Sequence, residues 1–180
     1  MSSNQILRAA ERTVTPWKNG GGLTREVAVS PSGAGVADFD WRLSMADVAQ
    51  GGPFSCFPGV DRVIMVVEGP GMALTVDGTE HLVGQRFRPF AFPGDAVTQC
   101  RLLGGPLVDF NVMTRRDRVR AEVSVGREAA EMPVGALALV LDGSAELDGE
   151  RLGRLDAVLA GLGGTLRVDG VAAVLRFHPV

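Results

Sequence analysis

Short apolar or alternating runs recur along this sequence between glycine, proline and aspartate turn signals, and this pattern restricts what the chain can fold into. The 180 residues include 24 glycines and 10 prolines, so the elements between turns must be short. No long run with helical periodicity and matching caps predicts a helix beyond short connectors. The sequence therefore predicts an all-β fold. The expected strands are Leu23–Val29, Trp41–Val48, Val63–Val67, Met72–Val76, Glu80–Val83, Arg88–Phe92, Thr98–Leu103 and Val108–Met113.

The turns suggest that one β unit occurs twice. Asp77-Gly78 is typical of a two-residue type I′ hairpin. In the last third of the chain, Leu137–Leu141 followed by a turn at Asp142-Gly143 repeats the pattern of Val63–Val67 followed by Glu68-Gly69. Closed barrels remove the open edges of many short antiparallel strands, so we expect two small fused antiparallel β-barrels or jelly rolls. The expected division is residues 1–116 and 117–180, and the pattern leaves open whether the N-terminal strands cross over to the second half.

Composition excludes several classes of protein. With 46% hydrophobic and 22% charged residues and a net charge of −3, the chain is typical of a globular protein. Apart from Arg115–Arg120, which we expect to be a solvated strand or linker, it lacks the clustered positive charge that binds nucleic acid. No N-terminal apolar segment predicts a signal peptide, and no apolar stretch is long enough to span a membrane. Cys56 and Cys100 are far apart and predict neither a disulfide framework nor a zinc ribbon. We therefore expect a cytoplasmic protein without nucleic-acid or membrane partners.

The motifs of several enzyme classes are missing. The sequence has only two histidines, His81 and His178, so a site with three histidine ligands is impossible. It contains no nucleophile elbow, no P-loop and no glycine-rich dinucleotide turn before a helix. Acyl transfer and nucleotide chemistry are therefore not predicted.

A small-barrel fold invites comparison with the cupins. Val63–Gly69 resembles the strand and turn that end the first cupin motif, but Arg62 stands where a metal cupin has its glutamate ligand, and the preceding histidine pair falls on Ser55 and Phe57 or on Cys56 and Pro58. Val97 stands where the second motif has its histidine. A guanidinium suits a carboxylate rather than a cation. The comparison predicts an anion site in place of the metal, and no cofactor.

Three segments together resemble the HutD/Ves family. They are Pro16–Glu26 (PWKNGGGLTRE), Gly52–Arg62 (GPFSCFPGVDR) and Asp109–Met113, with Trp41–Ser44 in support. The resemblance is strong over residues 5–116 and extends to the tail only in architecture. It implies a bicupin fold without the cupin metal, no established catalytic activity, and a bacterial role in histidine utilisation. It also implies a small acidic ligand, such as urocanate or formylglutamate, through which expression or flux is restrained.

The chemistry of such ligands suggests a role for each candidate residue. Arg62 would clamp a carboxylate, Lys18 would add charge, and asparagines would pair with an amide or ring nitrogen between aromatic walls. Alternation in Trp41–Val48 sends Arg42 and Ser44 to one face and Trp41, Leu43 and Met45 to the other. The candidate ligand-binding residues are Trp17, Lys18, Asn19, Arg25, Arg42, Ser44, Phe54, Phe57, Asp61, Arg62, Asn111 and Met113, with no catalytic or metal-ligating residue among them.

Structural roles compete with these assignments. The aromatic residues would equally fill a core, and Arg25, Arg42 and Arg62 would equally pair with Glu26, Asp61 or Asp109. Gly20–Gly22 would serve a crowded turn with positive φ, or an anion nest.

Three functions follow from this reading. The first is a metal-independent binding protein for an acidic intermediate of histidine breakdown. The second is a metal-independent cupin enzyme, an isomerase, hydrolase or lyase acting on a small carboxylate, with Asp61, Lys18 or His81 as the acid-base group. The third is an interaction protein, a homodimer or a partner of another protein, that docks through barrel edges or Arg115–Arg120.

Overall fold

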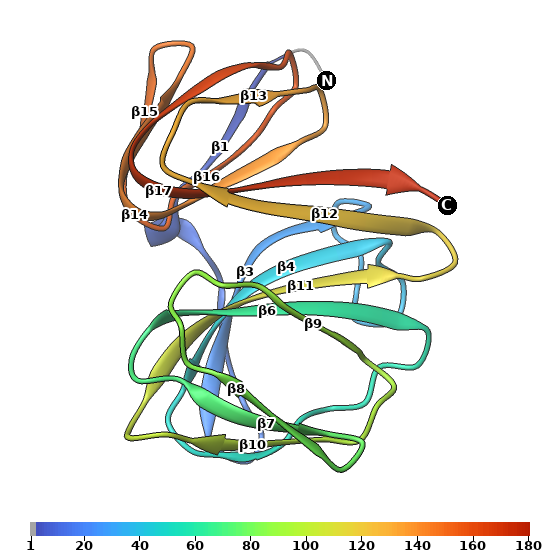
Figure 1. The fold of residues 1–180 in the computed structure, drawn as a ribbon. Coiled ribbons are helices and arrows are strands. Elements are labelled where there is room, and N and C mark those ends of the chain that lie inside the picture. Colours follow the sequence, from blue (N-terminus) through green and yellow to red (C-terminus); the bar gives the residue numbers. More distant parts are fainter. Residues whose placement is uncertain (1–2) are drawn as a thin grey trace. The chain divides into compact units, whose positions relative to one another are not determined.

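The computed structural model describes residues 3–180, and nearly all of its regular structure is β-strand (Figure 1). A 3-10 turn, η1 (Ala9–Glu11), is the one helical element of this described part. The all-β prediction is therefore confirmed. None of the helical structure in residues 3–180 is long and apolar enough to cross a membrane.

The chain forms two compact units. The first barrel comprises Thr13–Val119, and the second comprises residues 3–12 and Arg120–Pro179. The chain passes between them at Val119, a few residues beyond the expected position. Because β1 (Gln5–Leu7) pairs with β16 (Ala157–Leu159), the N-terminal strand belongs to the sheet of the second barrel.

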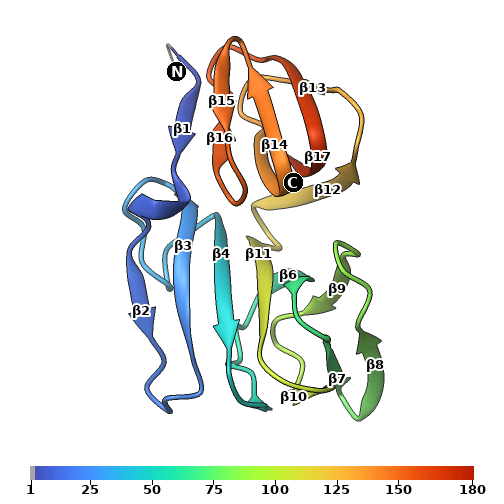
Figure 2. The same cartoon turned by 90° about the vertical axis from the view of Figure 1, so that its left-hand side faces the viewer.

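Two antiparallel sheets build the first barrel. The larger is ordered β2 (Val14–Pro16), β3 (Gly22–Ser30), β4 (Trp41–Val48), β11 (Leu107–Arg115), β6 (Val60–Glu68) and β9 (Phe90–Pro93). The smaller is ordered β5 (Gly52–Pro53), β10 (Thr98–Leu102), β7 (Met72–Val76) and β8 (Thr79–Val83). Figure 1 shows the two sheets facing each other, and Figure 2 shows β2, β3, β4 and β11 side by side.

Local sequence explains the hairpin and the two faces of the larger sheet. Asp77 and Gly78, between β7 and β8, have φ of +46° and +85°, as a type I′ turn requires. On β4, Ser44 lies on the same face as Ala46 and Val48, and Leu43 lies on the other. Both hairpin and alternation agree with the sequence.

A shared apolar cluster holds the two sheets of the first barrel together. The larger sheet contributes Ile64 and Val66 from β6, and the smaller contributes Met72 and Leu74 from β7. The side of each strand that carries these residues is called the barrel interior below. A second interior cluster of Phe39, Val60 and Met113 lies farther along the same strands.

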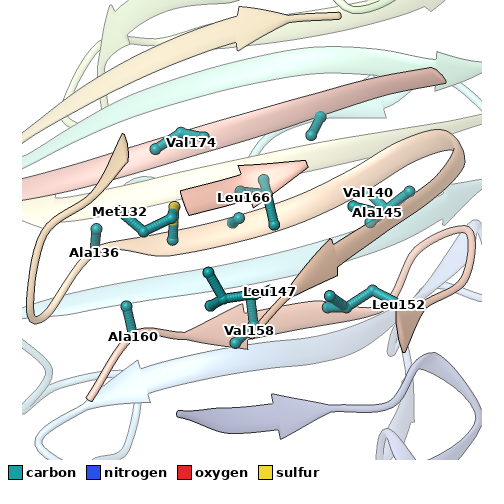
Figure 3. Close-up of a cluster of buried hydrophobic side chains, with 12 residues drawn as sticks. Met132, Ala136, Val140, Ala145, Leu147, Leu152, Val158, Ala160, Leu166 and Val174 are labelled. Carbon is teal, nitrogen blue, oxygen red and sulfur yellow. The ribbon is translucent and has the colours of Figure 1, made fainter. Parts of the chain in front are cut away.

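The second barrel is a seven-stranded sheet around an apolar core. Its main path is β1, β16, β14 (Leu137–Leu147), β17 (Gly164–Pro179) and β12 (Val119–Gly126), with β13 (Ala130–Met132) on β17 and β15 (Glu150–Leu152) on β14. Figure 3 shows the core, whose buried residues are all apolar: Met132, Ala136, Ala138, Val140, Ala145, Leu147, Leu152, Val158, Ala160, Leu166, Ala172 and Val174.

The predicted turn at Asp142-Gly143 is wrong. β14 runs through these residues without reversing, and its register with β17 shifts between Val140 and Asp142, which marks a β-bulge. Gly143 pairs with Gly170, and a Cβ at either position would collide with a carbonyl oxygen of the facing strand. The glycine is required by this close approach of two strands rather than by a chain reversal.

Candidate functional site

Arg62 lies inside the first barrel with only 6% of its surface exposed. It is placed there by strand alternation on β6, because it shares a face with the core residues Ile64 and Val66. Its cross-strand neighbours are Met113 on β11 and Phe92 on β9. A full positive charge therefore occupies an apolar stretch of the interior.

Three phenyl rings surround the guanidinium. Its Cζ lies 5.1 Å from the ring centroid of Phe54, 5.6 Å from that of Phe57 and 5.0 Å from that of Phe92. These distances are within the range of cation–π attraction. Arg62 is thus held in an aromatic cage formed by β9 and the segment that follows β5.

Backbone hydrogen bonds hold the cage in place. The Phe54 N–H donates to the Thr98 carbonyl (2.9 Å), and the Phe57 N–H donates to the Gly94 carbonyl (2.7 Å). A Cβ on Gly94 would lie 2.7 Å from the carbonyl oxygen of Val60, so only glycine allows the chain to pass here. In the sequence Phe-Pro-Gly at residues 92–94, Phe92 therefore contributes a ring to the cage, and Gly94 accepts the hydrogen bond that positions Phe57.

Arg62 makes little use of its donors. Within residues 3–180, its one hydrogen bond runs from Nε to Oδ1 of Asn111 and is long, at 3.4 Å. Burial lowers the pKa of Arg62 to about 10, and the nearby Asp109 carboxylate partly opposes this effect. The terminal nitrogens of the guanidinium are left available for an acceptor that the described chain does not supply.

Asp109 carries the opposite charge that acts on the pKa of Arg62, and it is also buried, at 3% exposure. It lies on the interior face of β11 with Asn111 and Leu107. Among the described residues its carboxyl group has no side-chain hydrogen bond or ion pair. Burial raises the pKa of Asp109 to about 7, the charge of Arg62 lowers it, and Asp47 raises it further. Near neutral pH, Asp109 therefore compensates Arg62 only in part.

Three more polar side chains complete this layer of the interior. Ser44 on β4 lies directly opposite Asn111 and is 3% exposed. Arg42, two residues before Ser44 on the same face of β4, donates from Nε to Oε2 of Glu26 on β3 at 2.9 Å. We refer to Arg42, Ser44, Arg62, Asp109 and Asn111 as the interior polar layer. The third charged residue of this layer, Arg42, has its charge compensated by Glu26, whereas Arg62 and Asp109 form no ion pair in the described chain.

This interior does not fit a cupin metal. Arg62 occupies the position where a metal cupin has its glutamate ligand, and Val97, at the position of the histidine of the second motif, is 71% exposed. In residues 3–180, no three His, Cys, Asp or Glu side chains gather closely enough to hold a metal ion. A fixed guanidinium among phenyl rings would repel a cation and attract an anion.

The structure brings most of the candidate residues together but places others elsewhere. Arg42, Ser44, Phe54, Phe57, Arg62, Asn111 and Met113 all face the interior. The indole of Trp17 packs against the end of the core and donates to Thr24 Oγ1 at 2.8 Å. Lys18 and Asn19 are exposed in the turn before β3, where Asn19 Oδ1 accepts from the Gly21 N–H at 3.0 Å.

Two further candidates lie away from the interior, and each pairs there with another side chain. Arg25 lies on the opposite face of the larger sheet, where it pairs with Asp47 at 2.6 Å. Asp61 is exposed and pairs with Arg116 at 2.7 Å. Neither is positioned to reach a ligand beside Arg62.

Asp109 and Phe92 are missing from the sequence-derived list. Alternation provided a signal for Asp109, since Asn111 and Met113 lie on the same strand at spacings of two. Phe92 lies in the segment compared with the second cupin motif, and only the pairing of β9 with β6 brings it to Arg62.

The basic segment Arg115–Arg120, which begins at the end of β11, is used within the fold. Arg115 donates to the Pro58 and Ala37 carbonyls, Arg116 to Asp61 and Asp95, and Arg118 to Asp40. These cations tie loops of the first barrel together, which argues against their use as a free docking surface.

The sequence profile of the HutD family matches residues 9–175. This chain belongs to the HutD family. The family is associated with histidine utilisation. Its relatives include an uncharacterised 21.2 kDa protein in the hutC 3′ region of Pseudomonas putida, 46% identical over 68% of this chain and 64% of that protein.

Two proteins named Ves are also relatives. The one from Citrobacter koseri is 45% identical over 62% of this chain and 58% of that protein, and the one from Cronobacter sakazakii is 37% identical over 77% of both. Two of these three alignments thus span less than two thirds of the relative.

Solved structures of HutD-like proteins match nearly the whole chain. HutD from Pseudomonas fluorescens, determined in a formate condition, superposes with a TM-score of 0.88 at 33% identity, covering 99% of this chain and 100% of that one. A conserved protein of unknown function from Pseudomonas aeruginosa gives 0.85 at 36% identity, covering 98% and 99%. A bacterial pirin from Escherichia coli, at 12% identity and a TM-score of 0.64, shares the bicupin-like fold alone.

Proposed function

We propose that the interior of the first barrel binds the carboxylate of a small acidic intermediate of histidine breakdown, and that this HutD-family protein thereby modulates histidine utilisation. The observation that carries the proposal is Arg62, a buried guanidinium with one long hydrogen bond among the described residues. A carboxylate accepts two parallel hydrogen bonds from such a group and compensates its charge. Urocanate and formylglutamate are the candidate ligands, and formate is the smallest probe of the same chemistry.

The surroundings of Arg62 suit a small acid with a partly apolar body. Phe54, Phe57 and Phe92 offer ring faces, and Asn111 and Ser44 offer hydrogen-bonding groups for an amide or a ring nitrogen. Urocanate, a flat imidazole with one carboxylate, would stack on the phenyl rings and bind Arg62. Formylglutamate, a formamide with two carboxylates, would bind Arg62 with one carboxylate and Asn111 with its amide. Its second carboxylate would then face Arg42 or solvent.

A thermal-shift screen tests the proposal directly. A ligand present at 100 times its Kd should stabilise the protein by about 3 kcal/mol. Urocanate, formylglutamate and formate should raise the unfolding midpoint. The Arg62→Met variant should lose the effect, whereas Arg101→Met, which removes an exposed ion pair with Glu80, should retain it. The absence of any shift with these acids, or a shift that survives Arg62→Met, would contradict the proposal.

One observation favours enzymatic turnover as a second candidate. Asp109 is buried beside Arg62 with a pKa raised to about 7, and such a carboxylate suits general acid–base work near neutral pH. The groups suggested from sequence are less suited, because Lys18 and Asp61 are exposed and outside the interior. Incubation of each acid with a high concentration of protein, followed by NMR, distinguishes the two: any product that disappears in Asp109→Asn supports turnover.

We extend the proposal to a cytoplasmic location and to assembly with a second copy or another protein. Cys56 and Cys100 are free thiols, which suits a reducing cytoplasm. Ligand binding would be transmitted to other proteins if it changed the formation of a homodimer or of a complex with a partner. Sedimentation with and without ligand would detect either.

A further inference from the structure

Arg62 and Asp109 lie in the same interior without direct contact. They are 6% and 3% exposed, and within residues 3–180 no ion pair joins them. The cross-strand neighbours of Asp109 are Ala46 on β4 and Val66 on β6, both apolar and buried. The carboxyl group therefore lies in a medium that penalises its charged form and supplies it with no side-chain donor.

Few other charges face Asp109. The thiol of Cys100 on β10 lies near it, and burial together with Asp109 raises the pKa of that thiol to about 11, so the thiol is neutral. Asp47 on β4 acts from the opposite face and is paired with Arg25, and Glu26 on β3 is paired with Arg42. β5, β7 and β9 contribute no charged residue, and His81 on β8 packs against the Phe90 ring at 4.9 Å between centroids.

An incoming carboxylate changes this charge balance. With Asp109 ionised, the ligand would place a second negative charge beside a single guanidinium in an apolar interior. Two carboxylates in such a position do not both remain ionised, because both charges would depend on one guanidinium in a largely apolar interior. The ligand takes the donors of Arg62, so Asp109 is the group left without stabilisation.

We propose that the first barrel binds one carboxylate together with one proton, and that Asp109 holds the proton. The proton comes from solvent, the Asp109 carboxylate becomes a neutral carboxyl group, and no other bond changes. The protonated group then has an O–H to donate to the ligand. This inference rests on the proposed carboxylate site and adds its linkage to pH.

Calorimetry measures the proton directly. Formate and formylglutamate are suitable probes because their carboxylates stay ionised between pH 6.5 and 8.5. At pH 8, binding heats in phosphate and in Tris buffer should differ by the ionisation heat of nearly one proton per bound ligand. With a pKa of about 7 for Asp109 in the free protein, the apparent Kd should rise about 25-fold from pH 6.5 to 8.5.

Variants assign the proton to its residue. Asp109→Asn should bind the same probes with a Kd that does not change with pH and without buffer-dependent heat. Asp47→Asn, on the other face of the sheet, should retain the proton uptake. Binding by the wild type without proton uptake and with a flat Kd would overturn the inference and leave the carboxylate site standing. Failure of both probes to bind would overturn the site and the inference together. The wild-type measurements decide even where Asp109→Asn does not fold.

Discussion

Replacement of Arg62 by methionine should make the ligand-free protein more stable. Burial lowers the pKa of Arg62 to about 10, so keeping it charged in the folded state costs about 3 kcal/mol at pH 6. This destabilisation is fully present below pH 10 and disappears as the pH rises toward the ordinary arginine range, where the group is neutral in the fold. Asp109 is largely protonated at pH 6, so its loss of a partner adds little.

The attraction between Arg62 and its cage offsets part of this cost. Desolvated cation–π contacts contribute about 2 kcal/mol, and methionine restores some of that through contacts of its sulfur with Phe54, Phe57 and Phe92. The net expectation is that Arg62→Met raises the free energy of unfolding by about 1–2 kcal/mol while abolishing carboxylate binding.

Tryptophan fluorescence during urea unfolding is the appropriate assay. The chain has two tryptophans, Trp17 and Trp41, and both lie in the first barrel, so the signal reports on the unit that carries the substitution. The matched control is Arg101→Met, which removes an exposed pair with Glu80 and should change the unfolding free energy by less than about 0.5 kcal/mol.

The sign of the result separates two roles for Arg62. If Arg62 and Asp109 form a structural pair, removing one partner should destabilise the barrel by about 3–5 kcal/mol. A loss of that size in Arg62→Met would refute the view that this cation is kept for a ligand. A gain in stability accompanied by loss of binding would support it.

Three further predictions concern cysteine accessibility, a close contact at a glycine and a surface ion pair. Cys56 is exposed and Cys100 is buried with its pKa raised to about 11, so a thiol reagent should modify one cysteine in the native protein and two in urea. Gly22→Ala should cost about 1–3 kcal/mol in unfolding free energy, because its Cβ would meet the Asp47 carbonyl oxygen and lie 3.0 Å from the Trp17 ring, whereas Gly35→Ala, with its nearest contact at 3.9 Å, should be neutral. Hydrogen bonds from Arg116 lower the pKa of Asp95 to about 2. The stability that ionised Asp95 contributes is therefore present above the ordinary aspartate pKa and is lost as the pH falls through about 2. Carbon NMR of the Asp95 carboxyl group should show this titration, and Arg116→Gln should return its pKa toward the ordinary range.

Local patterns explain why most strands could be predicted from sequence. Trp41–Val48 and Met72–Val76 begin and end as predicted, because alternation and turn residues lie within the segment itself. The glycine at residue 143 was ambiguous, since a bulge and a turn both require it. Only its pairing with Gly170, in a strand far along the chain, decides between them.

The candidate site was predictable where strand alternation controls it. Arg42, Ser44, Asn111 and Met113 reach the interior because each lies at an even spacing from a core position on its own strand. Arg25 does not, since β3 places it opposite Met45, on the other face of the sheet. The Trp17–Asn19 segment was assigned to the site because its ring, charge and amide suit an acidic ligand, whereas the structure uses it for a turn and for packing against the core.

The interiors of the two barrels differ in their polar and charged content. The core of the second barrel is a continuous apolar cluster, the arrangement expected when an interior serves stability alone. The first barrel instead encloses a guanidinium with unused donors and a carboxyl group with no side-chain partner in the described chain, and each lowers the stability of that barrel. Such groups are destabilising in the absence of a ligand, and the proposed binding of a carboxylate and a proton would make them favourable. The interior polar layer is therefore where binding energy and pH dependence should both be found, and substitutions inside the second barrel should alter stability without altering either.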